Sequence, residues 1–138
     1  RQMGFPEERQ LDLRLIDRET AEELTGGAAS MIAWFRTSKP LPDDPLLQVC
    51  ALTYFSDITL AGTTLRNLGP DARERWQLAS LDHAMWFHDV FRADDWLLFV
   101  QDSTIAHGAH SLARGQFFSR DGLLVASAVQ EVLMRPRT

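Results

Sequence analysis

The stretch DPLLQVCALTYFSDITL, residues 44–60, decides the fold because it predicts one long buried helix. An aspartate at 44 followed by Pro45 is a strong helix start, with the aspartate as N-cap and the proline at the first helical position. Ten of the fifteen residues from 46 to 60 are apolar. A helix that is apolar nearly all round is a buried one. We expect it to end by residues 67–70, where the sequence reads Asn-Leu-Gly-Pro.

Strand signals flank this helix on both sides. Residues 11–17 alternate apolar and polar, residues 19–27 read as a loop or short helix, and residues 29–37 are a plausible second strand. After the helix the apolar period shortens to two, and the candidate strands are residues 77–88, 95–103, 109–119 and 123–134. The last two are joined by Asp121-Gly122, a specific hairpin signal. Consecutive strands with short turns indicate an antiparallel sheet.

One long helix with two strands before it and four after it predicts an α+β fold. An antiparallel β-sheet wrapped around a long central helix is the hotdog architecture, and a generic α+β sandwich fits the same pattern nearly as well. The sequence contains no internal repeat or linker. A chain of 138 residues fits one domain with a real core, so we expect residues 1–138 to form a single domain.

Composition excludes several classes of protein. The net charge of −5 argues against a nucleic-acid binder, and no apolar run approaches the length of a membrane-spanning helix. The contents of 45% hydrophobic and 24% charged residues are those of a soluble globular protein. Residues 1–9 lack the apolar core of a secretion signal. The single cysteine, Cys50, is expected to be a small buried residue in a reducing compartment, so we expect a cytoplasmic protein.

Asp57 is the first candidate for chemistry. Thr53, Ser56 and Asp57 are spaced so that they share one polar stripe of the helix. A carboxylate on a buried helix is costly unless it is paired, and burial raises its basicity, which suits a general base. The alternative is that the stripe is exposed, which leaves Asp57 an ordinary surface residue.

Gln130 and Ser80 are the other two candidates. Gln130 is the only polar member of an otherwise apolar set on the last strand, which runs 124, 126, 128, 130, 132 and 134. A buried glutamine is either a functional group or a structural one bonded to backbone. Ser80 offers a hydroxyl to hold a water or an acyl carbonyl. A nucleophilic serine needs a nearby histidine, and strand alternation puts His83 on the opposite face, so we do not expect a covalent serine mechanism.

Metal and phosphate sites have weaker signals. The four histidines, His83, His88, His107 and His110, lack a matching acidic or cysteine set, so metal binding is a weak hypothesis. Four arginines are candidates for contacts with the phosphates of a nucleotide-bearing ligand, although a solvated surface role is the simpler one for each; these are Arg92, Arg114, Arg120 and Arg135.

Four segments in the same order resemble the acyl-CoA thioesterase II family. They are residues 41–45, 54–57, 80–88 and 124–131. The resemblance spans roughly residues 30–135 and implies a hotdog that is the C-terminal half of a double hotdog. It implies that Asp57, Ser80 and Gln130 position a water that attacks the thioester, with no metal or redox cofactor. Ser80 stands where related chains often carry threonine.

The resemblance predicts hydrolysis of acyl-CoA to free fatty acid and coenzyme A. Because hotdog sites form where two hotdogs meet, it also implies pairing with an N-terminal half or with a second copy of the chain. Two alternatives remain. One is a non-catalytic hotdog that binds acyl-CoA or serves for dimerisation. The other is a hydratase or dehydratase, which is disfavoured because no histidine lies between residues 45 and 68.

Overall fold

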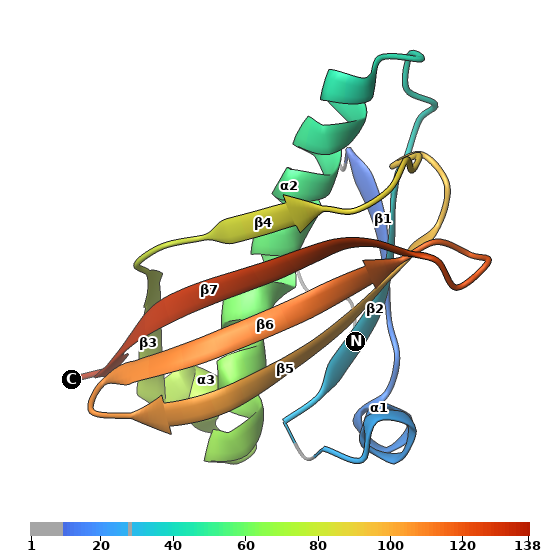
Figure 1. Cartoon of the computed structure of the whole chain (residues 1–138). Coiled ribbons are helices and arrows are strands. Elements are labelled where there is room, and N and C mark those ends of the chain that lie inside the picture. Colours follow the sequence, from blue (N-terminus) through green and yellow to red (C-terminus); the bar gives the residue numbers. More distant parts are fainter. Residues whose placement is uncertain (1–9, 28) are drawn as a thin grey trace.

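A seven-stranded antiparallel sheet curls around one long helix (Figure 1). The computed structural model describes residues 10–27 and 29–138. Residues 1–9, which were predicted to lack the apolar core of a secretion signal, lie outside the described residues. The strand order is β1-β2-β5-β6-β7-β3, and β4 also pairs with β7. This arrangement confirms the predicted hotdog architecture.

The elements follow one another as the apolar patterns predicted, with one exception treated below. Their bounds are β1 (Leu11–Leu15), α1 (Arg18–Thr25), β2 (Met31–Thr37), α2 (Pro45–Thr63), a 3-10 helix (Thr64–Leu68), α3 (Ala72–Arg75), β3 (Trp76–Ser80), β4 (Ala84–Phe87), β5 (Leu97–His107), β6 (His110–Phe118) and β7 (Leu124–Pro136). The predicted hairpin between β6 and β7 is present, with the amide of Gly122 donating to the carbonyl of Ser119 at 3.0 Å. Gly122 has a φ of 83°, a conformation that glycine adopts without penalty.

The central helix begins where its sequence predicted. The Asp44 carboxylate accepts a hydrogen bond from the backbone amide of Leu46 at 2.9 Å, and Pro45 occupies the first helical position. After Thr63 the chain tightens into the 3-10 helix and stops at Gly69, whose φ is 93°. In the described part of the chain, no helix is long and apolar enough to span a bilayer.

The prediction that α2 is buried all round is wrong for one side of the helix. Leu52, Phe55 and Leu60 pack into the core against the sheet. The opposite side forms an exposed stripe that consists of Leu46, Leu47, Cys50, Thr53, Tyr54 and Asp57. Cys50 is therefore exposed and not buried as expected. The sheet curls around one side of the helix only, so apolar residues on the other side stay uncovered in the single chain.

The predicted strand at residues 77–88 is also wrong, because it is two strands separated by a bulge. Ser80 pairs with Val132 and Ala84 pairs with Val129, so three residues of the edge face two of β7. The Asp82 carboxylate fills the gap by accepting the backbone amide of Glu131 at 2.8 Å. One extra residue reverses the alternation of faces downstream of it.

A cluster of phenylalanines fills the core between α2 and the sheet. The rings of Phe99 and Phe117 stack with centroids 3.8 Å apart, and Phe35 packs edge-on against both. Gly115 on β6 is buried under the Phe99 ring, so a Cβ atom at this position would overlap the ring. The close stacking therefore requires glycine at 115.

Gly115→Ala is expected to lower the free energy of unfolding by about 1–3 kcal/mol, because an added methyl group overpacks the core. Urea denaturation measures the change. The matched control is Gly62→Ala in α2, where an added Cβ meets no atom within 4 Å. The control is expected to raise the stability by about 0.5–1 kcal/mol because alanine favours the helix. Equal stability of Gly115→Ala and wild type would contradict the packing described above.

Candidate active site

One buried amide brings the three predicted site residues together. Gln130 is 0% exposed, and its Nε2 donates to Asp57 Oδ1 at 2.9 Å and to Ser80 Oγ at 2.6 Å. Gln130 comes from β7, Asp57 from α2 and Ser80 from β3. In the sequence, Gln130 lies 73 positions from Asp57 and 50 positions from Ser80. We call Asp57, Gln130 and Ser80 the cluster.

The local structure explains how Gln130 reaches its partners. Alternation along β7 points Gln130 toward α2, in line with Ala128 and Val132, which are also buried. β3 pairs with β7 so that Ser80 lies opposite Val132, and this register brings the Ser80 hydroxyl within reach of the amide. Asp57 lies on α2 at the border of its exposed stripe, within hydrogen-bonding distance of Gln130.

The hydrogen atoms of the cluster can be assigned from its contacts. Both hydrogens of the Gln130 amide are used, one by Asp57 and one by Ser80. The Ser80 hydroxyl therefore accepts from Gln130 and directs its own hydrogen to the backbone carbonyl of Asp82 at 3.1 Å. Gln130 Oε1 is buried without a hydrogen-bond partner among the described residues. A buried acceptor without a partner costs about 1–3 kcal/mol. The two hydrogen bonds that the Gln130 amide donates are therefore its contribution to the structure, and its oxygen contributes none.

Asp57 is not buried, which corrects the premise from which it was first singled out. Its side chain is 65% exposed, and Ser80 is exposed as well. The alternative of an exposed polar stripe holds for Thr53 and Asp57, whereas Ser56 is fully buried. The cluster thus combines a buried donor with two oxygen-bearing side chains at an open margin, where a ligand can reach them.

His83 is a neighbour of the cluster that the sequence analysis placed wrongly. Strand alternation put His83 on the face opposite Ser80, but the bulge at residues 81–83 turns its ring toward α2. Its Nε2 lies 2.8 Å from Ser56 Oγ, and its Nδ1 lies 3.7 Å from Asp57 Oδ1. The ring is only 20% exposed. No periodicity signals a bulge of one residue, so the sequence alone gave no means of finding this contact.

Three of the four candidate phosphate-binding arginines pair with acidic residues away from the cluster. Arg92 bonds Asp94 and Asp43, Arg114 bonds Asp102, and Arg120 lies 3.4 Å from Asp95. The hydrogen bonds to Asp94 and Asp43 raise the pKa of Arg92, and the hydrogen bond from Arg92 lowers the pKa of Asp94 to about 2. These arginines form ion pairs that join neighbouring loops and strands.

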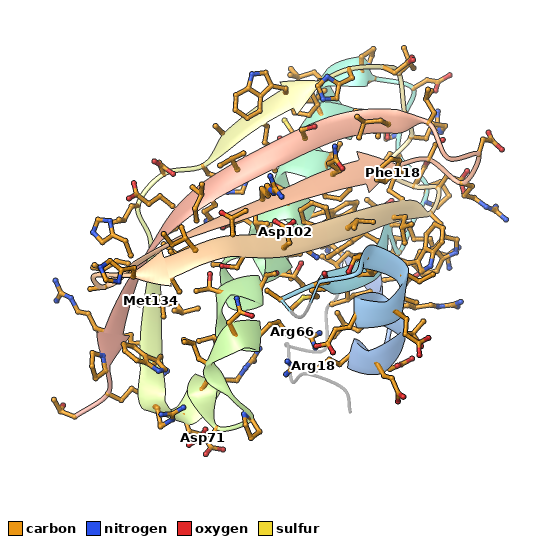
Figure 2. The ribbon with its side chains drawn as sticks, turned by 60° about the horizontal axis from the view of Figure 1, so that its bottom comes forward. Arg18, Arg66, Asp71, Asp102, Phe118 and Met134 are labelled. Carbon is orange, nitrogen blue, oxygen red and sulfur yellow. The ribbon has the colours of Figure 1, made fainter. Side chains whose placement is uncertain are left out.

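Neither a metal centre nor the hollow on the outer face of the sheet coincides with the cluster. Within residues 10–27 and 29–138, no group of three or more His, Cys, Asp or Glu side chains is placed to hold a metal ion. A hollow of about 730 Å³ lies over β5, β6 and β7, and Asp102 and Arg114 are among its lining residues. Figure 2 looks onto the side of the sheet turned away from α2, where Asp102 is labelled. None of the cluster residues lines this hollow.

The fold and the cluster together define a class of protein. It is a hotdog domain in which a central helix and two strands hold an acid, an amide and a hydroxyl at one open margin. The chain belongs to the acyl-CoA thioesterase family, whose model, described as "Acyl-CoA thioesterase", matches residues 5–133. This match confirms the family resemblance found in the sequence.

Individual relatives agree with the family. The chain is 38% identical over 108 residues to acyl-CoA thioesterase 2 of Haemophilus influenzae, which covers 78% of this chain and 38% of the relative. It is 31% identical over 126 residues to acyl-coenzyme A thioesterase 8 of Mus musculus, covering 91% and 39% of the two chains. A solved acyl-CoA thioesterase II from Mycobacterium marinum is 46% identical with a TM-score of 0.85, covering 94% of this chain and 50% of that one. The chain thus spans about two fifths of the length of these curated relatives.

Proposed function

We propose that this chain is a catalytic hotdog half that hydrolyses acyl-CoA thioesters to free fatty acid and coenzyme A. The observation that carries the proposal is the double donation by Gln130, which fixes a carboxylate and a hydroxyl side by side at an open margin. Membership of the acyl-CoA thioesterase family supplies the substrate class. The reaction needs no metal or redox cofactor in this scheme.

The geometry gives each residue of the cluster a role. Gln130 occupies Oδ1 of Asp57, so the other carboxylate oxygen is free to accept a proton from water. The water attacks the acyl carbonyl, its proton passes to Asp57, and the carbon–sulfur bond then breaks. Coenzyme A leaves as the thiolate and takes up the proton that Asp57 received, which restores the carboxylate, and the acyl group leaves as the free acid. Ser80 orients the water or the carbonyl, and positioning and general-base help supply the rate.

The open margin is where we propose that a second hotdog binds. Tyr54 lies one helical turn before Asp57 and is 60% exposed. Phe87 on β4 pairs with the buried Ala126 and is 42% exposed on the side of the sheet that faces α2. Trp86 pairs with Ser127 and is 52% exposed on the outer side of the same strand. β4 pairs with β7 along one edge only. A partner on this surface, either an N-terminal half or a second copy of the chain, would exclude water around Asp57 and complete the pocket.

Trp86→Ser is expected to weaken this pairing at least 10-fold, because Trp86 is a large exposed aromatic on β4, and such side chains carry much of the binding energy of interfaces. Sedimentation velocity over a range of concentrations measures the association, with an added N-terminal hotdog half if the chain alone is monomeric. Leu24→Ser is the control, since Leu24 is exposed on α1, far from β4. Equal weakening by both substitutions would contradict a specific interface at β4.

The test of the proposed function is release of free coenzyme A from a medium-chain acyl-CoA, followed with a thiol reagent. Turnover by the paired protein is the expected result. Binding without turnover in the paired protein would favour the non-catalytic module. Hydration of an enoyl-CoA is measured on the same preparation, because His83 brings to α2 the histidine that residues 45–68 lack. Hydration in place of hydrolysis would overturn the proposal in favour of the hydratase.

We place this reaction in the cytoplasm. Support comes from Cys50, a free and exposed thiol of the kind that a reducing compartment preserves. Fractionation of cells that produce the protein, with detection by antibody, tests the location. Recovery in an oxidising compartment would contradict it.

A further inference from the structure

The mechanism above leaves His83 without a role, although its ring lies beside Asp57. Its Nδ1 lies 3.7 Å from Asp57 Oδ1, the same oxygen that Gln130 occupies. Its ring is mostly buried between α2 and the bulge, and Nδ1 has no hydrogen-bond partner. A buried ring nitrogen without a partner beside a carboxylate requires an explanation.

The contact with Ser56 holds the other ring nitrogen. Ser56 Oγ lies 2.7 Å from the backbone carbonyl of Thr53, 2.8 Å from His83 Nε2 and 3.3 Å from the sulfur of Met85. The hydroxyl either donates to the Thr53 carbonyl and accepts from Nε2, or donates to Nε2. In both arrangements the fully buried Ser56 fixes the position of the ring.

The proton on Nδ1 follows from its neighbour. A bare Nδ1 would place its lone pair beside a carboxylate oxygen 3.7 Å away, and two acceptors in that position repel each other. An N–H at Nδ1 instead faces the carboxylate, and it is compatible with either direction of the bond to Ser56.

The other charged groups near His83 are engaged elsewhere. The carboxylate of Asp82, the preceding residue, accepts the backbone amide of Glu131. The Glu131 carboxylate, on β7, bonds His110 at 2.8 Å. Asp57 is the acidic group that faces Nδ1 of His83.

We propose that His83 is a positioning residue whose Nδ1–H, held in place by the bond between its ring and Ser56, orients the Asp57 carboxylate toward the attacking water. The role rests on the proposed hydrolase function, because it acts through Asp57. It combines side chains from the helix with one from the bulge, so the one extra residue at 81–83 serves the site. The N–H also gives Asp57 a donor when a partner covers the margin.

The proton on Nδ1 is tested directly by NMR of the chain labelled with 15N-histidine, near neutral pH. We expect Nδ1 of His83 to show the chemical shift of a protonated ring nitrogen, and this signal to change in Asp57→Asn. His107, which is exposed, serves as the reference in the same spectrum. A bare Nδ1 in the wild type, or a signal that Asp57→Asn leaves unchanged, would overturn the proposal. This readout does not depend on turnover, so failure of the hydrolase function is distinguishable from failure of this inference.

Kinetics of the paired protein separate positioning from mere structure. His83→Phe is expected to lower kcat for hydrolysis about 10- to 100-fold, a cost typical of misplaced catalytic groups, with KM within about twofold. His83→Asn keeps an N–H near the Nδ1 position, and His83→Gln keeps one near the Nε2 position. Asn should restore more activity than Gln, because the contact with Asp57 matters more than that with Ser56. Better rescue by Gln, or a change in KM alone, would count against the proposal. His107→Asn and His107→Gln are the controls.

Discussion

Asp57→Asn is expected to lower kcat for acyl-CoA hydrolysis by about 10²- to 10⁴-fold, the range of a lost general base. Asparagine has the same size but cannot accept the proton of the attacking water. Because Asp57 lies at the exposed margin and contributes no buried surface, substrate binding should persist with KM nearly unchanged. Release of free coenzyme A under saturating substrate measures kcat.

The matched control for this experiment is Asp71→Asn. Asp71 is also exposed and pairs with Arg75 at the start of α3, away from the cluster. Both variants should unfold within about 0.5 kcal/mol of the wild type, as exposed substitutions usually do. Full turnover by Asp57→Asn would remove Asp57 from the mechanism. Equal loss in both variants would show that the effect is not local.

Gln130→Leu is expected to change activity and stability in opposite directions. Leucine fills a similar volume but donates nothing, so Asp57 and Ser80 lose the group that holds them together. We expect kcat to fall about 10²- to 10³-fold, as when an oriented donor is removed from a catalytic site. Stability should stay level or rise, because the substitution also removes the buried Oε1 that has no partner, while the freed oxygens of Asp57 and Ser80 face water.

Thermal unfolding and coenzyme A release on the same samples give both quantities. Gln116→Leu is the control, since Gln116 is exposed on the outer side of β6. A large loss of stability in Gln130→Leu would mean that Gln130 is a structural residue of β7. Retained turnover would mean that Asp57 and Ser80 do not need the hydrogen bonds from Gln130 for catalysis.

Local chemistry predicted much of this molecule. The Asp44-Pro45 start of α2 follows from rules that act within one helical turn, and so does the turn at Gly122. The inward direction of Gln130 follows from the regular alternation of buried and half-buried residues along β7 from residue 126 to 134. Sequence order and motif similarity then placed Asp57, Ser80 and Gln130 in one site, and the fold brings them within hydrogen-bonding distance.

The remaining features depend on tertiary structure. Alternation across residues 77–88 predicted one strand, and a single extra residue at the bulge reversed the direction of every side chain after it. His83 reached Asp57 for this reason. The apolar residues of α2 indicated a helix that needs to be covered. A sequence cannot tell whether the surface that covers it belongs to the same domain or to a second one. Asp57 was therefore expected inside and lies at the margin.

The bulge at 81–83 also governs what can be added to the sheet. β3 and β4 lie along the same side of β7 and expose five and four residues, but they are out of phase by one residue. A foreign strand aligned with one of them cannot continue in register along the other. Uncontrolled strand addition, the first step of fibril growth, is therefore limited to a few residues at this edge. Deleting one residue from the bulge would join the two strands and remove this protection against aggregation.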